Sequence, residues 1–259
     1  MYILKIIDFI SDRQIWESPH PWPRFDGYFA EPGKSALEIR DVVAKAFNID
    51  MTARIDADLR GIADIIKEAH GIACRDFGHL LVEDITYVLC PMSPESVFVM
   101  EEMNGIGGFA ARDAVLLYLN PVGDWKNLFL RVVLHETNHS IRYPFGDPFA
   151  SFRDWVILEG MAECYLAEKQ PERPLSPWVT AASVDDLPHF FPRVKNFWDG
   201  FHPPVGNARE WFYGSKSLCI PKWAGYALGY HLVSQHRKKH AHMRWIDYIK
   251  TSSKEFDWE

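Results

Sequence analysis

The sequence predicts an α+β protein, in which a small antiparallel β-sheet lies in an N-terminal lobe packed on a helical C-terminal lobe. Short runs rich in β-branched and aromatic residues occur between residues 85 and 120, where proline and glycine separate them. After residue 123, apolar residues recur instead at the spacing of amphipathic helices. The chain has 259 residues, of which 47% are hydrophobic, so it can bury a sizeable core. We therefore expect a mixed α/β lobe over residues 1–123 and a helical lobe over 124–259, which together form one compact unit.

The N-terminal lobe is expected to begin with an apolar segment and a loop rich in proline and aromatic residues, up to residue 34. From Ser35 to His70 the apolar residues follow a helical period, which predicts two helices with a break near residues 48–52. Proline and the glycine-rich stretch 104–108 separate the strand-like runs that follow, as in a small antiparallel sheet. Those runs occupy residues 85–89, 96–100 and 114–120.

The C-terminal lobe is expected to be built from helices. A proline-rich stretch at 171–177 and a turn at 202–206 interrupt it, and such breakers mark helix ends. The periodic segments between them predict helices at residues 124–142, 151–168, 185–198, 222–237 and 243–250.

Charge and composition narrow the class of protein. The formal net charge is −7, and this mildly acidic balance gives no basic footprint for a nucleic-acid partner. No run of ~18 uncharged apolar residues occurs, so we expect no membrane span. The apolar N-terminus carries charges and lacks small residues at a cleavage site, so we expect no signal peptide and a cytoplasmic location. The cysteines have no disulfide or metal spacing and are expected to be buried thiols: Cys74, Cys90, Cys164 and Cys219.

The strongest functional signal is the segment RVVLHETNHSIR, in which His135 and His139 stand four residues apart. On a helix, residues four apart lie on one face, so both imidazoles can bind one ion. Neutral imidazole nitrogen is a good zinc ligand. Glu136 follows the first histidine and can reach a water molecule rather than the ion. Because an exposed helix with two ordinary histidines gives the same HExxH pattern, the motif alone is only suggestive.

A second acidic pattern supports the metal interpretation. The segment WVILEGMAECYLAE places Glu159 and Glu163 four residues apart on another predicted helix. A catalytic zinc usually takes three protein ligands and keeps its fourth position for water. The neighbours of both acids are mostly apolar, and a buried carboxylate without a metal or charge partner is costly. We therefore expect one acid to be the third ligand and the other to orient a ligand histidine through a hydrogen bond.

The combination of HExxH and a downstream EGxAE resembles the glutamate-zincin clan of metallopeptidases, which includes thermolysin-like enzymes and large aminopeptidases. More narrowly, HExxHxxR, EGxAE and the late WAGYALGY resemble a bacterial family of largely uncharacterised predicted zinc-dependent proteases, over roughly residues 85–237. The resemblance implies a zincin-like (gluzincin) fold, bound Zn²⁺ and a peptide or protein substrate. It also implies that Glu159 is the third ligand, with Glu163 in the orienting place. The first 80 residues have no counterpart in this resemblance.

The same resemblance suggests a donor for the oxyanion. In the aminopeptidase branch, a tyrosine in a YxxG context donates a hydrogen bond to the tetrahedral oxyanion, and Tyr226 with Gly229 matches that context. Tyr230 lies one turn later and is the second candidate, and two core tyrosines would give the same pattern. Gly229 is expected to let this helix pack closely against its neighbour.

Two further features have alternative interpretations. The segment 104–120 could form an edge strand above the metal that binds substrate backbone by strand addition, although a hairpin turn explains Gly107 and Gly108 equally well. Arg142 follows His139 by one turn, and it either pairs with an acid near the site or closes the helix.

Together these patterns predict a zinc-dependent hydrolase that is most simply a peptidase. His135, His139 and Glu159 hold Zn²⁺, Glu136 takes a proton from the attacking water and passes it to the leaving amine, and Tyr226 stabilises the oxyanion. The main alternative is a metal-binding regulatory or interaction protein that keeps the site without turnover, which would have no need of the Glu136 base. A helical interaction module with incidental motifs is a third possibility, and metal analysis would distinguish it.

Overall fold

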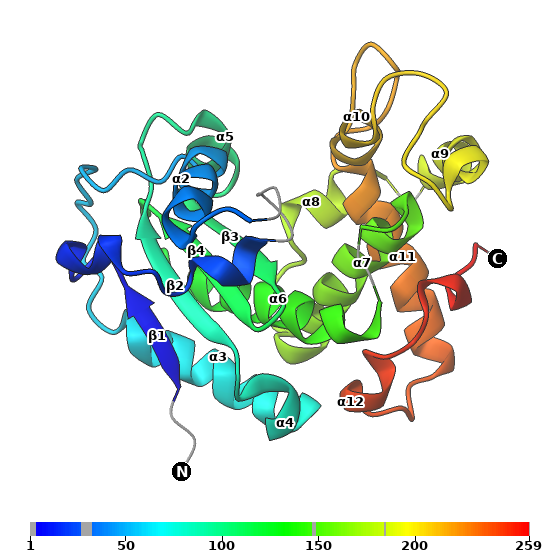
Figure 1. Cartoon of the computed structure of the whole chain (residues 1–259). Helices are drawn as coiled ribbons and strands as arrows, with labels where there is room; N and C mark the ends of the chain where they lie inside the picture. Colours follow the sequence, from blue (N-terminus) through cyan, green and yellow to red (C-terminus); the bar gives the residue numbers. More distant parts are fainter. Residues whose placement is uncertain (1–3, 27–32, 147–148, 184, 259) are drawn as a thin grey trace. The chain divides into compact units, whose positions relative to one another are not determined.

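The computed structural model describes residues 4–26, 33–146, 149–183 and 185–258 (Figure 1). Part of the predicted N-terminal loop, residues 27–32, lies outside the described residues. The chain separates into two compact units, residues 1–141 and 142–259, and each is described by itself. The protein is α+β, as the sequence predicts.

A four-stranded sheet forms the centre of the first unit, in the order β1-β2-β4-β3 among the described residues. Strand β2 pairs in parallel with both β1 and β4, whereas β3 pairs antiparallel with β4. The expectation of an antiparallel sheet is therefore wrong, because the sheet is mixed. The strands span Lys5–Asp8 (β1), Thr86–Pro91 (β2), Ile106–Ala111 (β3) and Ala114–Leu119 (β4).

The parallel pairing follows from the helices that connect the strands. Helices α2 (Ala36–Ala46) and α3 (Ile62–Phe77) lie between β1 and β2, and they confirm the two helices predicted for this stretch. A helical crossover returns the chain to the end of the sheet from which it left, so the next strand runs parallel. Strand β1 has four residues and was not recognised as a strand from its local pattern.

The expected strand at residues 96–100 is also wrong. This segment is the short helix α5 (Val97–Glu102), and Met100 N–H donates to the Ser96 carbonyl at 2.9 Å. Val97 and Phe98 are adjacent in sequence and both exposed, with 62% and 49% of their surface accessible. A strand with one buried face would have placed such neighbours on opposite sides. The strand was predicted wrongly because the prediction relied only on the apolar composition of residues 96–100.

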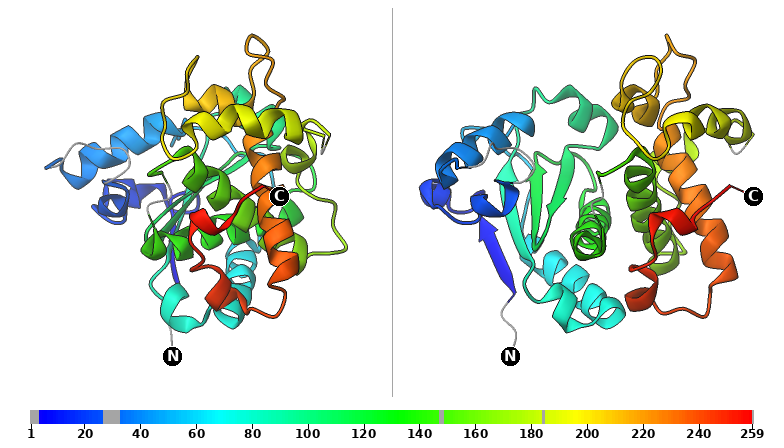
Figure 2. Two further views of the ribbon diagram at one scale, coloured as in Figure 1. Left: turned by 90° about the vertical axis from the view of Figure 1, so that its right-hand side faces the viewer. Right: turned by 45° about the vertical axis from the view of Figure 1, so that its right-hand side comes forward.

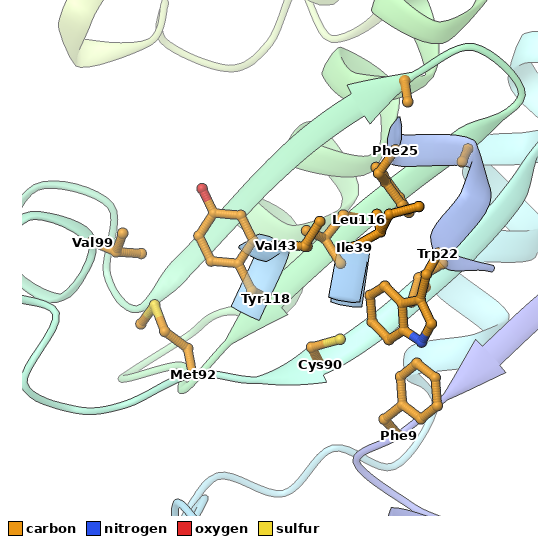
Figure 3. Close-up of a cluster of buried hydrophobic side chains, with 13 residues drawn as sticks. Phe9, Trp22, Phe25, Ile39, Val43, Cys90, Met92, Val99, Leu116 and Tyr118 are labelled. Atoms are coloured by element: carbon orange, nitrogen blue, oxygen red, sulfur yellow. The ribbon is translucent and has the colours of Figure 1, made fainter. Parts of the chain in front are cut away.

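Helices cover both faces of the sheet (Figure 1, Figure 2). On one face, α2 and the short helix η2 (Trp22–Phe25) pack over β2 and β4, where Ile39, Leu116 and Tyr118 belong to one buried cluster (Figure 3). On the other face lie α3 and α6 (Lys126–Arg142). The α6 helix confirms the prediction of a helix at 124–142.

The second unit is helical, and its longest helices α7 (Phe152–Lys169) and α11 (Ala224–Lys239) pack against each other. A Cβ atom added at Gly160 of α7 would lie 2.2 Å from the Gly229 carbonyl oxygen of α11. The two helices therefore touch through their backbones, which confirms the close packing expected at Gly229.

Shorter helices surround this pair. Helices α9 and α12 fall within the predicted segments, whereas α8 and α10 were missed. None of the helices within the described ranges is long and apolar enough to cross a membrane. The shorter helices span Pro177–Thr180 (α8), Leu187–Val194 (α9), Ala208–Tyr213 (α10) and Trp245–Tyr248 (α12).

Candidate metal centre

Helix α6 presents His135 and His139 side by side. Their ring centroids lie 4.4 Å apart, with the ring planes at 78° to each other. Both side chains are buried, with 8% and 5% of their surface accessible. The helical spacing predicted from the HExxH motif therefore brings both imidazoles to one face, as a shared ion requires.

Hydrogen bonds to the sheet fix the rotation of α6 about its axis. Thr137 Oγ lies 3.1 Å from the Tyr87 hydroxyl of β2, and Ser140 Oγ donates to the Ala111 carbonyl of β3 at 2.9 Å. Since successive residues turn by about 100° around a helix, Thr137 lies nearly opposite the two histidines. These contacts hold α6 to the sheet by a side that leaves the histidine face for ligand binding.

Glu136 lies against strand β3. A Cβ atom built on Gly108 would be 2.4 Å from Glu136 Cγ and 2.8 Å from Oε1. The carboxylate is buried, with 8% of the residue accessible. The acid of HExxH therefore packs directly on the backbone of the edge strand.

Glu159 completes a cluster with the two histidines. One ligand atom from each of His135, His139 and Glu159 lies within 4.8 Å of the other two, and all three residues are buried. Two imidazoles and one carboxylate are a donor set found at catalytic zinc. Donors placed ~2.0–2.2 Å from a tetrahedral ion are separated by roughly 3.4 Å, so ligation requires only a small contraction of this cluster. The residues fit a metal ion, and the cluster could bind one.

Glu159 lies on helix α7, in which Ser151 caps the N-terminus and Gly160 makes a close contact in the middle. Ser151 caps its N-terminus by accepting a hydrogen bond from Asp154 N–H at 3.1 Å. Such a cap satisfies one of the amide groups that have no partner inside the helix. Gly160 follows Glu159 directly and makes the backbone contact with α11. The candidate ligand Glu159 therefore lies next to the point where α7 and α11 touch through their backbones.

The Glu163 carboxylate has two partners that the sequence interpretation missed. Ser176 Oγ donates to one oxygen at 2.6 Å, and Trp178 Nε1 donates to the other at 2.8 Å. Glu163 is 2% accessible, so both bonds offset the cost of burying its charge. The sequence does indicate that a helix starts at this point, because Ser176 is followed directly by a proline. Nothing in that local pattern identified Glu163 as the partner.

Tyr226 and Tyr230 lie in different surroundings on α11. The Tyr226 ring belongs to an aromatic cluster, with its centroid 5.0 Å from that of Phe212 and 6.1 Å from that of Trp178. Burial raises the pKa of the Tyr230 hydroxyl above its usual value, and the nearby Cys164 and Glu163 add to the effect. Tyr230 therefore lies near Cys164 and Glu163 of α7, whereas Tyr226 lies among aromatic rings of α8 and α10.

Arg142, the last residue of α6, binds the C-terminal segment. Its guanidinium donates to the Ile249 carbonyl at 2.7 Å and to the Thr251 carbonyl at 3.0 Å. Burial lowers the pKa of Arg142 to about 10, an effect that the charge of Asp154 partly offsets. These bonds to two carbonyls connect the last residue of the histidine helix to residues 249–251.

Among known proteins, the chain is similar to one relative and matches one family model. The uncharacterized protein YjfC of Bacillus subtilis (strain 168) is 24% identical over 224 residues, which cover 82% of this chain and 69% of YjfC. A comparison with solved structures finds no match. The family model described as "Predicted Zn-dependent protease (DUF2268)" matches residues 67–257, a range that contains all three members of the His-His-Glu cluster. Because this match spans most of the chain, the protein belongs to the DUF2268 family of predicted zinc-dependent proteases.

Proposed function

We propose that the protein is a zinc peptidase of the gluzincin type, in which His135, His139 and Glu159 hold one zinc ion. The observation that carries the proposal is the buried cluster of two imidazoles and a carboxylate within 4.8 Å. Membership of a family of predicted zinc-dependent proteases supports the same activity. The acid Glu136 follows directly after His135 on α6 and is buried with it.

Glu136 acts as the general base in this proposal. Zinc, when bound, supplies a Lewis acid that polarises the scissile carbonyl and lowers the pKa of water to about 7. Glu136 takes the proton of the attacking water and delivers it to the amine that leaves. Since the carboxylate packs against Gly108, it is held on the side of β3 that faces α6. A protein that only bound metal would have no need of a base there.

The oxyanion of the tetrahedral intermediate requires a donor, and we assign this role to Tyr226. Its ring packs near those of Phe212 and Trp178, and this packing restricts the directions in which the hydroxyl can point. Tyr230 is the second candidate, one turn later on α11. Donors that are already oriented stabilise developing charge without reorganisation during the reaction.

Strand β3 supports the binding of an extended peptide. It is the last strand in the order β1-β2-β4-β3, so one side of it has no strand partner within the described part of the chain. Gly107 and Phe109 pair with Tyr118 and Leu116 of β4. In an antiparallel pair of strands, opposed residues alternate between hydrogen-bonded and non-hydrogen-bonded pairs. The Asn120 N–H donates to the Gly105 carbonyl, so Gly107 and Phe109 also belong to hydrogen-bonded pairs and Gly108 does not. The backbone groups of Gly108 therefore point away from β4, where its N–H faces the side on which a strand could add and its carbonyl accepts a hydrogen bond from the Tyr118 hydroxyl.

The test combines metal analysis with turnover. Protein purified without chelators should contain about one zinc per chain by elemental analysis, and it should cleave members of a fluorogenic peptide library. Glu136→Gln should keep the zinc and the fold while turnover falls by ~10²–10⁴-fold, because the amide cannot accept the proton. Zinc binding without cleavage by the wild type would favour a metal-binding regulatory protein. Absence of zinc even after its addition would overturn the proposal.

A further inference from the structure

Two consecutive glycines lie inside strand β3 rather than at its turn. Gly107 and Gly108 are opposite Tyr118 and Leu117 of β4, whereas the hairpin turn comes later, where Asp113 has a φ of 59°. Neither glycine has a positive φ, so any residue could adopt this backbone. A glycine within a strand often marks the close approach of another group. The groups that lie beside these glycines, and not the backbone conformation, therefore leave no room for a side chain there.

The two glycines are approached from opposite faces of the sheet, because neighbouring residues of a strand point to opposite sides. A Cβ atom at Gly107 would lie 2.1 Å from a ring carbon of Tyr118. A Cβ atom at Gly108 would instead lie 2.4 Å from Glu136 Cγ and 2.9 Å from Cδ. Ordinary contact begins near 3.4 Å, so Glu136 would have to move by about 1 Å to admit one methyl group.

Tyr118 contacts strand β3 on the face opposite Glu136. Its ring crosses the strand over Gly107, and its hydroxyl donates to the Gly108 carbonyl at 3.3 Å. The side chain is 8% accessible and belongs to the buried cluster under α2 (Figure 3). The peptide at Gly108 is therefore held by Tyr118 on one side and contacted by Glu136 on the other.

We infer that Gly108 is a positioning residue for Glu136: the absence of a side chain at this point of β3 sets where the carboxylate lies. The inference rests on the proposed role of Glu136 as the base. A displacement of about 1 Å in a reacting group can lower a rate by ~10²-fold. Gly108 acts through Glu136 and needs no contact with the ion.

The direct test is Gly108→Ala, compared in the wild-type and Glu136→Gln backgrounds. In the wild type, kcat should fall by ~10²-fold while KM and zinc content stay close to their original values. In the Glu136→Gln background, the same substitution should lower the residual rate no further, because the base is already lost. An unchanged kcat in the first background, or an equal further loss in the second, would overturn the inference.

A stability cycle tests the contact without any substrate. Gly108→Ala should lower the urea midpoint of unfolding, and Glu136→Ala in the same chain should restore most of that loss, because alanine has no Cγ to collide with the new methyl group. An equal loss in both backgrounds would overturn the inference. If the wild type cleaves no peptide while the restoration is observed, the proposed function fails and the placement of Glu136 by Gly108 stands.

Discussion

Trp178 donates its indole N–H to the Glu163 carboxylate at 2.8 Å, and its ring centroid lies 6.1 Å from that of Tyr226. With Ser176 bound to the other oxygen, both carboxylate oxygens of Glu163 are oriented. A carboxylate held in this way can in turn fix the ring of a ligand histidine, as partners of metal ligands commonly do. The partners of Glu163 should therefore influence metal binding without touching the ion.

Trp178→Phe removes the indole donor and keeps an aromatic ring. We expect zinc affinity to fall by ~10-fold, at the low end of the range for residues that orient metal ligands, as measured by competition with a chromogenic chelator. Trp198→Phe is the matched control, because Trp198 Nε1 is buried and has no hydrogen-bond partner among the residues described. Equal affinities in the two variants would contradict a role for Trp178.

Removal of a ligand should abolish tight zinc binding. His135→Ala, His139→Ala and Glu159→Ala each leave two protein donors where a catalytic zinc takes three, so most of the metal should be lost on purification. Glu163→Ala should weaken affinity by only ~10–100-fold. Elemental analysis of the four proteins gives the comparison. Full zinc content in any of the first three would remove that residue from the ligand set.

Tyr226→Phe deletes one oxygen and leaves the ring to pack against Phe212 and Trp178. Loss of an oxyanion donor lowers turnover by ~10²–10³-fold, with little effect on zinc content or melting temperature. Tyr230→Phe should be much milder. If the ranking is reversed, Tyr230 is the donor, and two mild variants would place the donor on another residue.

The crossing of α7 and α11 should not tolerate a side chain. A Cβ atom at Gly160 or at Gly229 would lie 2.2 Å from a carbonyl oxygen of the opposing helix. Gly160→Ala or Gly229→Ala should therefore lower the free energy of unfolding by about 1–3 kcal/mol in urea titrations. The control is Gly71→Ala in α3, where the nearest atom is 3.7 Å away. That substitution should stabilise the protein by about 0.5–1 kcal/mol, because alanine favours a helix over glycine.

His70 should make stability depend on pH. Burial lowers the pKa of His70 below its usual value of 6.5, and the nearby His79 lowers it further. The folded protein therefore resists protonation of this ring, so the unfolded chain binds more protons as the pH falls below 6.5. Stability should decline on acidification through that value. In His70→Gln, the difference between urea midpoints at mildly alkaline and mildly acidic pH should be smaller, and an unchanged difference would contradict this role.

Features that depend on neighbouring residues could be predicted from the sequence. The spacing of His135 and His139 is a property of one helix, and α6 forms where its apolar period indicates. The helix that carries Glu159 was predicted from its mostly apolar composition, and its burial is confirmed, since twelve consecutive residues from Trp155 to Leu166 are buried. Local patterns thus predicted the two helices that hold the candidate ligands.

Features that depend on distant residues could not be predicted. The parallel pairing of Lys5 with Thr86 joins segments that lie about 80 residues apart, with several helices between them, and no local pattern specifies it. The bonds from Ser176 and Trp178 to Glu163 likewise arise from how helices pack. The strand-like composition around Val97 was misleading, because β-propensity mainly reflects packing on a half-buried surface, and Val97 lies outside the sheet.

The bond from Arg142 to the Ile249 carbonyl has a consequence for synthesis, because it joins residues 107 positions apart. A ribosome adds about 5–20 residues per second, so Arg142 emerges roughly 5–20 s before its carbonyl partners. During that interval the guanidinium must remain hydrated, since a buried charge without acceptors is costly. The last residue of the histidine helix therefore acquires these contacts only after residues 249–251 have been made, and a nascent protein arrested before residue 249 should lack them.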